Sequence, residues 1–153
     1  MFFLAALLQN IVLFYLLGDA GAVNGAILIG SSERELKDSL GTYITGIFGK
    51  QVLGVDDTAD LLLQVIDKDL DLAIIDTNLK GLPVAKTVQI IKNCRPRIPV
   101  IIISEDYSVS TGSRIMEQGV FYYMYKPVDM DSLREIIDSA LKKRAKEEAQ
   151  ERR

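Results

Sequence analysis

Short apolar runs alternate with helical patterns along most of the chain. Five runs have the length and the continuous apolar character of strands covered on both faces; they occupy residues 26–29, 51–55, 70–75, 99–103 and 120–125. Helical patterns are expected between them and after the last one, over 33–48, from 57 or 58, after 83, over 108–118 and from 129 or 131. Because neighbouring parallel strands need helical crossovers, this alternation predicts a doubly wound α/β sheet.

The two ends of the chain differ from this body, which runs over 26–142. Residues 1–25 are an apolar segment followed by a linker of small residues, and 143–153 are a charged tail. As a helix, residues 1–17 would span ~25 Å, short of the ~30 Å hydrocarbon core of a bilayer. We expect an extra N-terminal apolar helix that forms a homodimer or packs onto the body. Membrane association through 1–17 and a non-native leader from an upstream start codon are the open alternatives. The tail is expected to extend the last helix.

The composition excludes several chemistries. The 153 residues include no histidine and a single cysteine, Cys94. The chain therefore lacks a Ser-His-Asp or Cys-His nucleophile, a histidine-ligated metal and an intramolecular disulfide. With 48% hydrophobic and 25% charged residues the sequence is globular, and its net charge of −3 argues against a partner made of nucleic acid.

Three polar side chains follow three of the apolar runs directly. Asp76 follows the third run, Ser104 the fourth and Lys126 the fifth. Ligand sites in doubly wound sheets lie at the carboxyl ends of the strands, so these side chains are expected to converge. A carboxylate can accept a phosphoryl group if cations and hydrogen-bond donors offset the charge of the phosphoryl oxygens. The alternative is that Asp76 merely caps a turn and that Lys126 is a solvated charge.

With these residues in this order, the segment 26–142 resembles the receiver domains of bacterial two-component response regulators. The resemblance rests on Asp76 after an apolar strand, Ser104 after 100–103, and Lys126-Pro127 after 123–125. It implies a flavodoxin-like three-layer sandwich of five strand–helix units, with parallel sheet order 2-1-3-4-5. It also implies a cytoplasmic signalling module without enzymatic activity. Asp76 would be phosphorylated by a histidine kinase or phosphotransfer protein, with Mg²⁺ bound alongside.

The resemblance also implies how such a module would switch. Ser104 would move toward the phosphoryl group while Tyr123 turns inward, and a downstream protein partner would bind the face formed by Tyr123 and the last helices. The Lys126-Pro127 bond is commonly cis in the family, at a cost of only ~0.5–1 kcal/mol. For Tyr123 the alternative is a strand aromatic packed under a helix.

The expected metal site departs from the family pattern. Family members place two adjacent acids after the first strand, where this chain has Ser31 and Ser32. The remaining candidate ligands are Asp76, Glu33 and the carbonyl of Asn78, and each missing carboxylate removes up to ~4 kcal/mol of attraction for a cation. We therefore expect Mg²⁺ binding to be weak or absent. A degenerate receiver that binds partners without phosphorylation is the alternative within the fold.

A function of another class is a flavodoxin-like protein that binds a phosphate-bearing cofactor. The turn Gly30-Ser31-Ser32 offers hydroxyl and backbone donors after the first strand. Against this, Glu33 would repel a phosphate, and the chain has neither a G-x-G-x-x-G nor a G-x-x-x-x-G-K-[ST] pattern.

Overall fold

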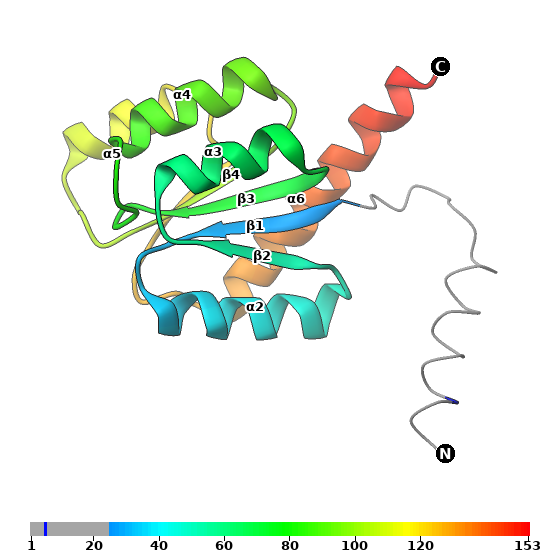
Figure 1. Ribbon diagram of the computed structural model, residues 1–153, viewed down its shortest axis with the longest axis horizontal. Coiled ribbons are helices and arrows are strands. Elements are labelled where there is room, and N and C mark those ends of the chain that lie inside the picture. The colour runs from blue at the N-terminus through cyan, green and yellow to red at the C-terminus, as the bar shows by residue number, and fades with distance from the viewer. Residues whose placement is uncertain (1–4, 6–24) are drawn as a thin grey trace.

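The computed structural model describes residue 5 and residues 25–153 (Figure 1). Apart from Ala5 and Gly25, the predicted N-terminal helix and linker lie outside the described residues. No helix among those described is long and apolar enough to cross a membrane.

Five parallel strands form one sheet in the order β2-β1-β3-β4-β5, which confirms the predicted fold class. The strands are β1 (Ala26–Gly30), β2 (Val52–Val55), β3 (Leu70–Asp76), β4 (Val100–Ser104) and β5 (Tyr122–Tyr125). The helices are α2 (Arg34–Phe48), α3 (Thr58–Asp67), α4 (Val84–Cys94), α5 (Val109–Met116) and α6 (Met130–Glu151). The fifth strand starts two residues later than predicted, and α5 is shorter than predicted. The last helix continues through most of the charged tail, as expected.

Two layers of helices cover the sheet, α2 and α6 on one face and α3, α4 and α5 on the other (Figure 1). Alternate strand residues enter different cores because side chains of a strand point to opposite faces. In β1, for example, Ile27 and Ile29 pack toward α2 and α6, whereas Leu28 packs toward α3, α4 and α5. With both faces covered, β1, β3 and β4 are buried along their whole length.

Candidate functional site

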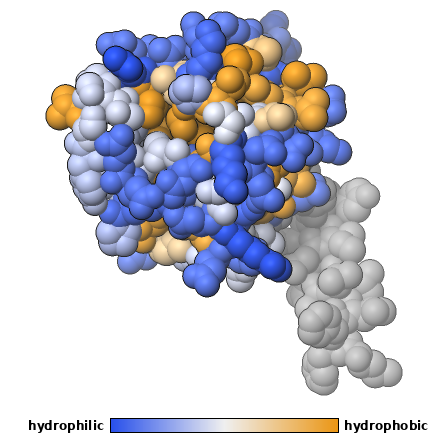
Figure 2. All heavy atoms as spheres, turned by 60° about the vertical axis from the view of Figure 1, so that its left-hand side comes forward, coloured by the Kyte–Doolittle hydropathy of each residue, from blue (hydrophilic) through white to orange (hydrophobic). Residues whose placement is uncertain are grey.

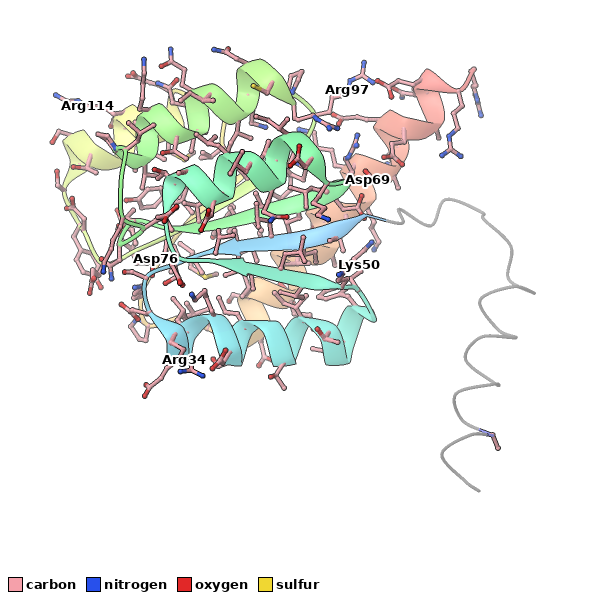
Figure 3. All side chains as sticks on the ribbon, in the orientation of Figure 1. Arg34, Lys50, Asp69, Asp76, Arg97 and Arg114 are labelled. Carbon is pink, nitrogen blue, oxygen red and sulfur yellow. The ribbon has the colours of Figure 1, made fainter. Side chains whose placement is uncertain are left out.

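The carboxyl ends of β1, β3, β4 and β5 meet at one edge of the sheet. Asp76 is the last residue of β3, and the ladder pairs it with Ile103, one residue before Ser104 at the end of β4. Ser104 in turn pairs with Tyr125, directly before Lys126. This register places the three predicted side chains on neighbouring strand ends, and Figure 3 shows Asp76 at that end of the sheet, with Lys50 at the opposite end.

The Asp76 carboxylate lies at the centre of a hydrogen-bond network and is only 1% exposed. Its Oδ2 accepts hydrogen bonds from Lys126 Nζ at 2.9 Å and from Ser31 Oγ at 2.7 Å. Its Oδ1 accepts a hydrogen bond from the backbone N–H of Asn78 at 3.0 Å. A buried carboxylate is tolerated only with such partners, so the site is electrostatically prepared for a negative charge at this point.

Lys126 carries the positive charge of the site and bridges two carboxylates. Its Nζ lies 2.9 Å from Asp76 Oδ2 and 2.9 Å from Glu33 Oε1, and its side chain is 15% exposed. Burial alone would lower the pKa of Lys126, but the hydrogen bonds to Asp76 and Glu33 outweigh it, so the pKa is raised above its ordinary value. The ammonium therefore stays charged at all physiological pH values.

Ser104 is fully buried beside the site, and its hydroxyl bonds to groups other than the Asp76 carboxylate. Its Oγ accepts a hydrogen bond from Thr77 Oγ1 at 3.2 Å and from the backbone N–H of Asp106 at 2.9 Å. The structure thus brings Asp76 and Lys126 into direct contact and places Ser104 one strand away, against the residue that follows Asp76.

The residues proposed as metal ligands are already engaged with protein donors. Asp76 and Glu33 share the ammonium of Lys126, and the Asn78 carbonyl accepts a hydrogen bond from Ser32 Oγ at 2.9 Å. The side-chain amide of Asn78 donates to Glu33 Oε1 at 2.7 Å. Among residue 5 and residues 25–153, no group of three or more acids, histidines or cysteines is placed to hold a metal. Mg²⁺ is commonly bound through one or two carboxylates, with water completing its octahedron; here both candidate carboxylates already share the Lys126 ammonium, so the arrangement fits the ion poorly.

The turn formed by Gly30, Ser31 and Ser32 at the end of β1 also gives no support to the binding of a phosphate-bearing cofactor. The hydroxyls of Ser31 and Ser32 donate to Asp76 and to the Asn78 carbonyl, so their protons are not directed toward a phosphate-binding site. A phosphate bound there would also face the carboxylates of Asp76 and Glu33, and like charges in contact repel.

A tyrosine that the sequence pattern did not single out connects the site to the surface. The Tyr107 hydroxyl donates a hydrogen bond to the backbone carbonyl of Lys126 at 2.9 Å. The Tyr107 ring stacks on Tyr125, with centroids 4.7 Å apart and planes 14° apart, and the two residues are 65% and 43% exposed. Figure 2 brings forward the end of the sheet at which Asp76 lies and shows a largely hydrophilic surface with hydrophobic residues interspersed. The only sequence signal for Tyr107 was an aromatic residue in the loop after the fourth strand.

Tyr123 is a partly buried strand aromatic packed under α5. Its ring packs against the core on the face that α3, α4 and α5 cover, and it meets Tyr125 edge-on with centroids 5.4 Å apart. The Tyr123 hydroxyl is buried and has no hydrogen-bond partner among the described residues. The Lys126-Pro127 bond is cis, as the resemblance implied.

The loop after β3 is shaped by Gly81, which lies five residues after Asp76. Gly81 has φ of 115°, and a Cβ added there would lie 2.2 Å from Thr58 Oγ1. The same hydroxyl accepts a hydrogen bond from the backbone N–H of Leu82 at 3.0 Å. Only glycine combines this backbone angle with such a close approach, so Gly81 fixes the path of the loop that follows Asp76.

Comparison with known proteins identifies the family of this chain. The chain matches the family described as Response regulator receiver domain over residues 27–138. It is 34% identical over 82 residues to the transcriptional regulatory protein ZraR of Salmonella typhimurium, which covers 54% of this chain and 19% of that protein. It is 29% identical over 119 residues to the transcriptional regulatory protein GlrR of Escherichia coli, covering 78% of this chain and 27% of that protein.

Solved structures support the same fold. A CheY-like response regulator receiver domain protein from Methanospirillum hungatei matches with a TM-score of 0.74 and 23% identity, covering 80% of this chain and 97% of that one. The signal receiver domain of an HD domain-containing protein from Pseudomonas fluorescens matches with a TM-score of 0.78 and 18% identity, covering 84% and 94%. The chain thus spans nearly all of these two structures but only about a fifth to a quarter of the curated relatives named above.

Proposed function

Since the chain belongs to the response regulator receiver domain family, we propose that it is a cytoplasmic signalling module whose output is the binding of a protein partner, with no catalytic output of its own. One observation carries the proposal. Lys126 contacts Asp76 through its ammonium at 2.9 Å and contacts Tyr107 through its backbone carbonyl at 2.9 Å. A change at the Asp76 carboxylate is therefore two contacts away from the exposed Tyr107 and Tyr125 rings.

Asp76 is the proposed phosphoacceptor. One carboxylate oxygen would form a bond to phosphorus while the bond from phosphorus to the donor's histidine nitrogen breaks, and the imidazole leaves with that electron pair. Oδ1 is the better placed oxygen because it accepts one hydrogen bond, whereas Oδ2 accepts two. Lys126 would offset the charge on the phosphoryl oxygens, and Ser104, linked to Thr77 at 3.2 Å, would donate to one of them after a rotation about its χ1 bond.

The upstream partner in this proposal is a histidine kinase or a phosphotransfer protein. The downstream partner would bind the surface around Tyr107 and Tyr125, where exposed aromatic rings offer rigid apolar contact area with a polar hydroxyl. The curated relatives are named as transcriptional regulatory proteins, and the chain covers 19% and 27% of their length.

Phosphorylation is tested by incubating the protein with acetyl phosphate and measuring its intact mass. We expect a single added phosphoryl group in the wild type and none in Asp76→Asn. Asp71→Asn is the matched control, because Asp71 is also a fully buried acid of β3 with a lysine partner, Lys50 at 2.6 Å, but lies at the other end of the strand. A phosphoryl adduct that persists in Asp76→Asn would contradict the assignment.

Phosphorylation-independent partner binding is the second candidate function. The specific observation in its favour is that two neutral hydroxyls, Ser31 and Ser32, face the oxygens of Asp76 and Asn78 where the family has acids. In this case acetyl phosphate would add nothing to the wild type. Asp76→Asn would still alter partner binding, because it removes one of the two negative charges that hold Lys126.

A further inference from the structure

Two loops meet at the carboxyl ends of β1 and β3, and three side-chain hydrogen bonds join them. Ser31 Oγ donates to Asp76 Oδ2 at 2.7 Å, Ser32 Oγ donates to the Asn78 carbonyl at 2.9 Å, and Asn78 Nδ2 donates to Glu33 Oε1 at 2.7 Å. Each bond pairs a neutral donor on one loop with an acceptor on the other. We infer that these hydrogen bonds replace a metal ion as the link between the two loops, so the site is assembled without Mg²⁺.

The serine hydroxyls are oriented against a cation. Ser31 is fully buried and engaged twice, since its Oγ donates to Asp76 and accepts the backbone N–H of Glu33 at 3.0 Å. Its proton therefore points at the Asp76 carboxylate, and the Ser32 proton points at the Asn78 carbonyl in the same way. To ligate a cation between the loops, both hydroxyls would have to turn away from these acceptors, and their oxygens would offer the ion only weak, neutral ligands.

The charge of the site leads to the same conclusion. Two carboxylates, Asp76 and Glu33, already share the ammonium of Lys126 at 2.9 Å each. A divalent cation would meet that ammonium and compete with it for the same oxygens. Aspartates at positions 31 and 32 would reverse the balance, because a carboxylate in place of Ser31 Oγ would repel Asp76 until a cation entered.

The test is a gain of metal binding on substitution, measured without any phosphodonor. Thermal unfolding is recorded in about 10 mM MgCl₂ and in NaCl of equal ionic strength, so that a specific ion raises the melting temperature by mass action. The proteins are the wild type, Ser31→Asp/Ser32→Asp, and the neutral control Ser31→Asn/Ser32→Asn, which has nearly the same shape as the aspartate variant. Ser32→Asp alone serves if the double aspartate variant fails to fold, since Ser32 is only partly buried.

For the wild type and for the asparagine control, we expect the melting temperature in MgCl₂ to equal that of the same protein in NaCl. Each restored carboxylate should strengthen Mg²⁺ binding about 10-fold or more, so the aspartate variant should melt about 4 °C higher in MgCl₂. Adding Asp76→Asn to that variant should remove the gain, which places the ion at this site. A wild type stabilised by MgCl₂ over NaCl would overturn the inference, as would a folded aspartate variant without any Mg²⁺ dependence.

The inference concerns the same site as the proposed function but fails separately from it. If acetyl phosphate never modifies Asp76, the melting experiment still decides whether hydrogen bonds replace the metal. If Mg²⁺ stabilises the wild type, phosphorylation of Asp76 is untouched and only the metal-free assembly is wrong.

Discussion

Replacement of Lys126 by methionine isolates the charge that the site depends on. The substitution keeps the length of the side chain and removes the ammonium that lies 2.9 Å from Asp76 Oδ2. At this separation and an effective dielectric constant of ~20, the gross attraction is about 6 kcal/mol, most of which is offset by the desolvation of both charges. Loss of one partner of a buried ion pair costs about 3–5 kcal/mol.

The lower end of that range applies to Lys126→Met, because Asp76 keeps the hydrogen bonds from Ser31 and from the backbone of Asn78. We expect a loss of about 3 kcal/mol in the free energy of unfolding by urea, or a melting temperature about 10 °C lower for a domain of this size. Lys142→Met is the control, since Lys142 pairs with Asp138 at 2.8 Å on the surface, with both side chains more than half exposed. Its cost should stay below about 1 kcal/mol.

A double-mutant cycle shows whether the cost arises from the Asp76 contact. Asparagine at position 76 carries no charge. In that background Lys126→Met removes only the ion pair with Glu33, whose side chain is 47% exposed. The substitution should then cost about 1 kcal/mol or less, which gives a coupling energy of about 2 kcal/mol between Asp76 and Lys126. An equal cost in both backgrounds would show that Asp76 and Lys126 are not coupled.

Three further predictions follow from single contacts. Ser31→Ala removes a buried hydroxyl donor to the Asp76 carboxylate, so urea unfolding should show a loss of about 1.5–3 kcal/mol, and an unchanged stability would contradict the network. Because the pKa of Lys126 is raised in the folded protein, its stabilising contribution is complete below the ordinary value of 10.5 and is lost as the pH rises through the folded-state pKa. The difference in unfolding free energy between wild type and Lys126→Met should therefore shrink only above pH 10.5. A difference that already shrinks at neutral pH would contradict the Asp76–Lys126 ion pair. Gly81→Ala should lower the free energy of unfolding by about 2–3 kcal/mol, because Gly81 has a φ of 115° and an added Cβ would lie 2.2 Å from Thr58 Oγ1. In the control Gly46→Ala the added Cβ meets nothing within 4 Å, so the unfolding midpoint should stay unchanged or rise.

The fold and the meeting of Asp76 with Lys126 could be predicted from the sequence. Continuous apolar runs identify buried strands, and the need for helical crossovers then makes the strands parallel. Once the strands are parallel, the residues directly after them must share one edge of the sheet. Asp76 and Lys126 are fifty positions apart in the sequence but only one contact apart in space for this reason.

The hydrogen bonds of the site could not be predicted in the same way. Strand ends set where Ser31, Ser32 and Asn78 lie to within a few ångströms, but the orientation of each hydroxyl or amide depends on loop backbone angles and side-chain rotamers. The sequence showed that two acids were missing, yet it did not show that serine donors fill their place. Tyr107 was missed because its role depends on a loop that brings its hydroxyl to the Lys126 carbonyl.

The most direct test of the account follows the ring signals of Tyr107 and Tyr125 by NMR in Asp76→Asn and Asp71→Asn. Both variants neutralise a buried acid of β3, at opposite ends of the strand. We expect Asp76→Asn to shift both ring signals, because Lys126 loses one of its two carboxylate partners and its backbone carbonyl accepts the hydrogen bond of the Tyr107 hydroxyl, whereas Asp71→Asn should leave the signals in place. Unchanged Tyr107 and Tyr125 signals in Asp76→Asn would show that the carboxylate and the surface are not connected.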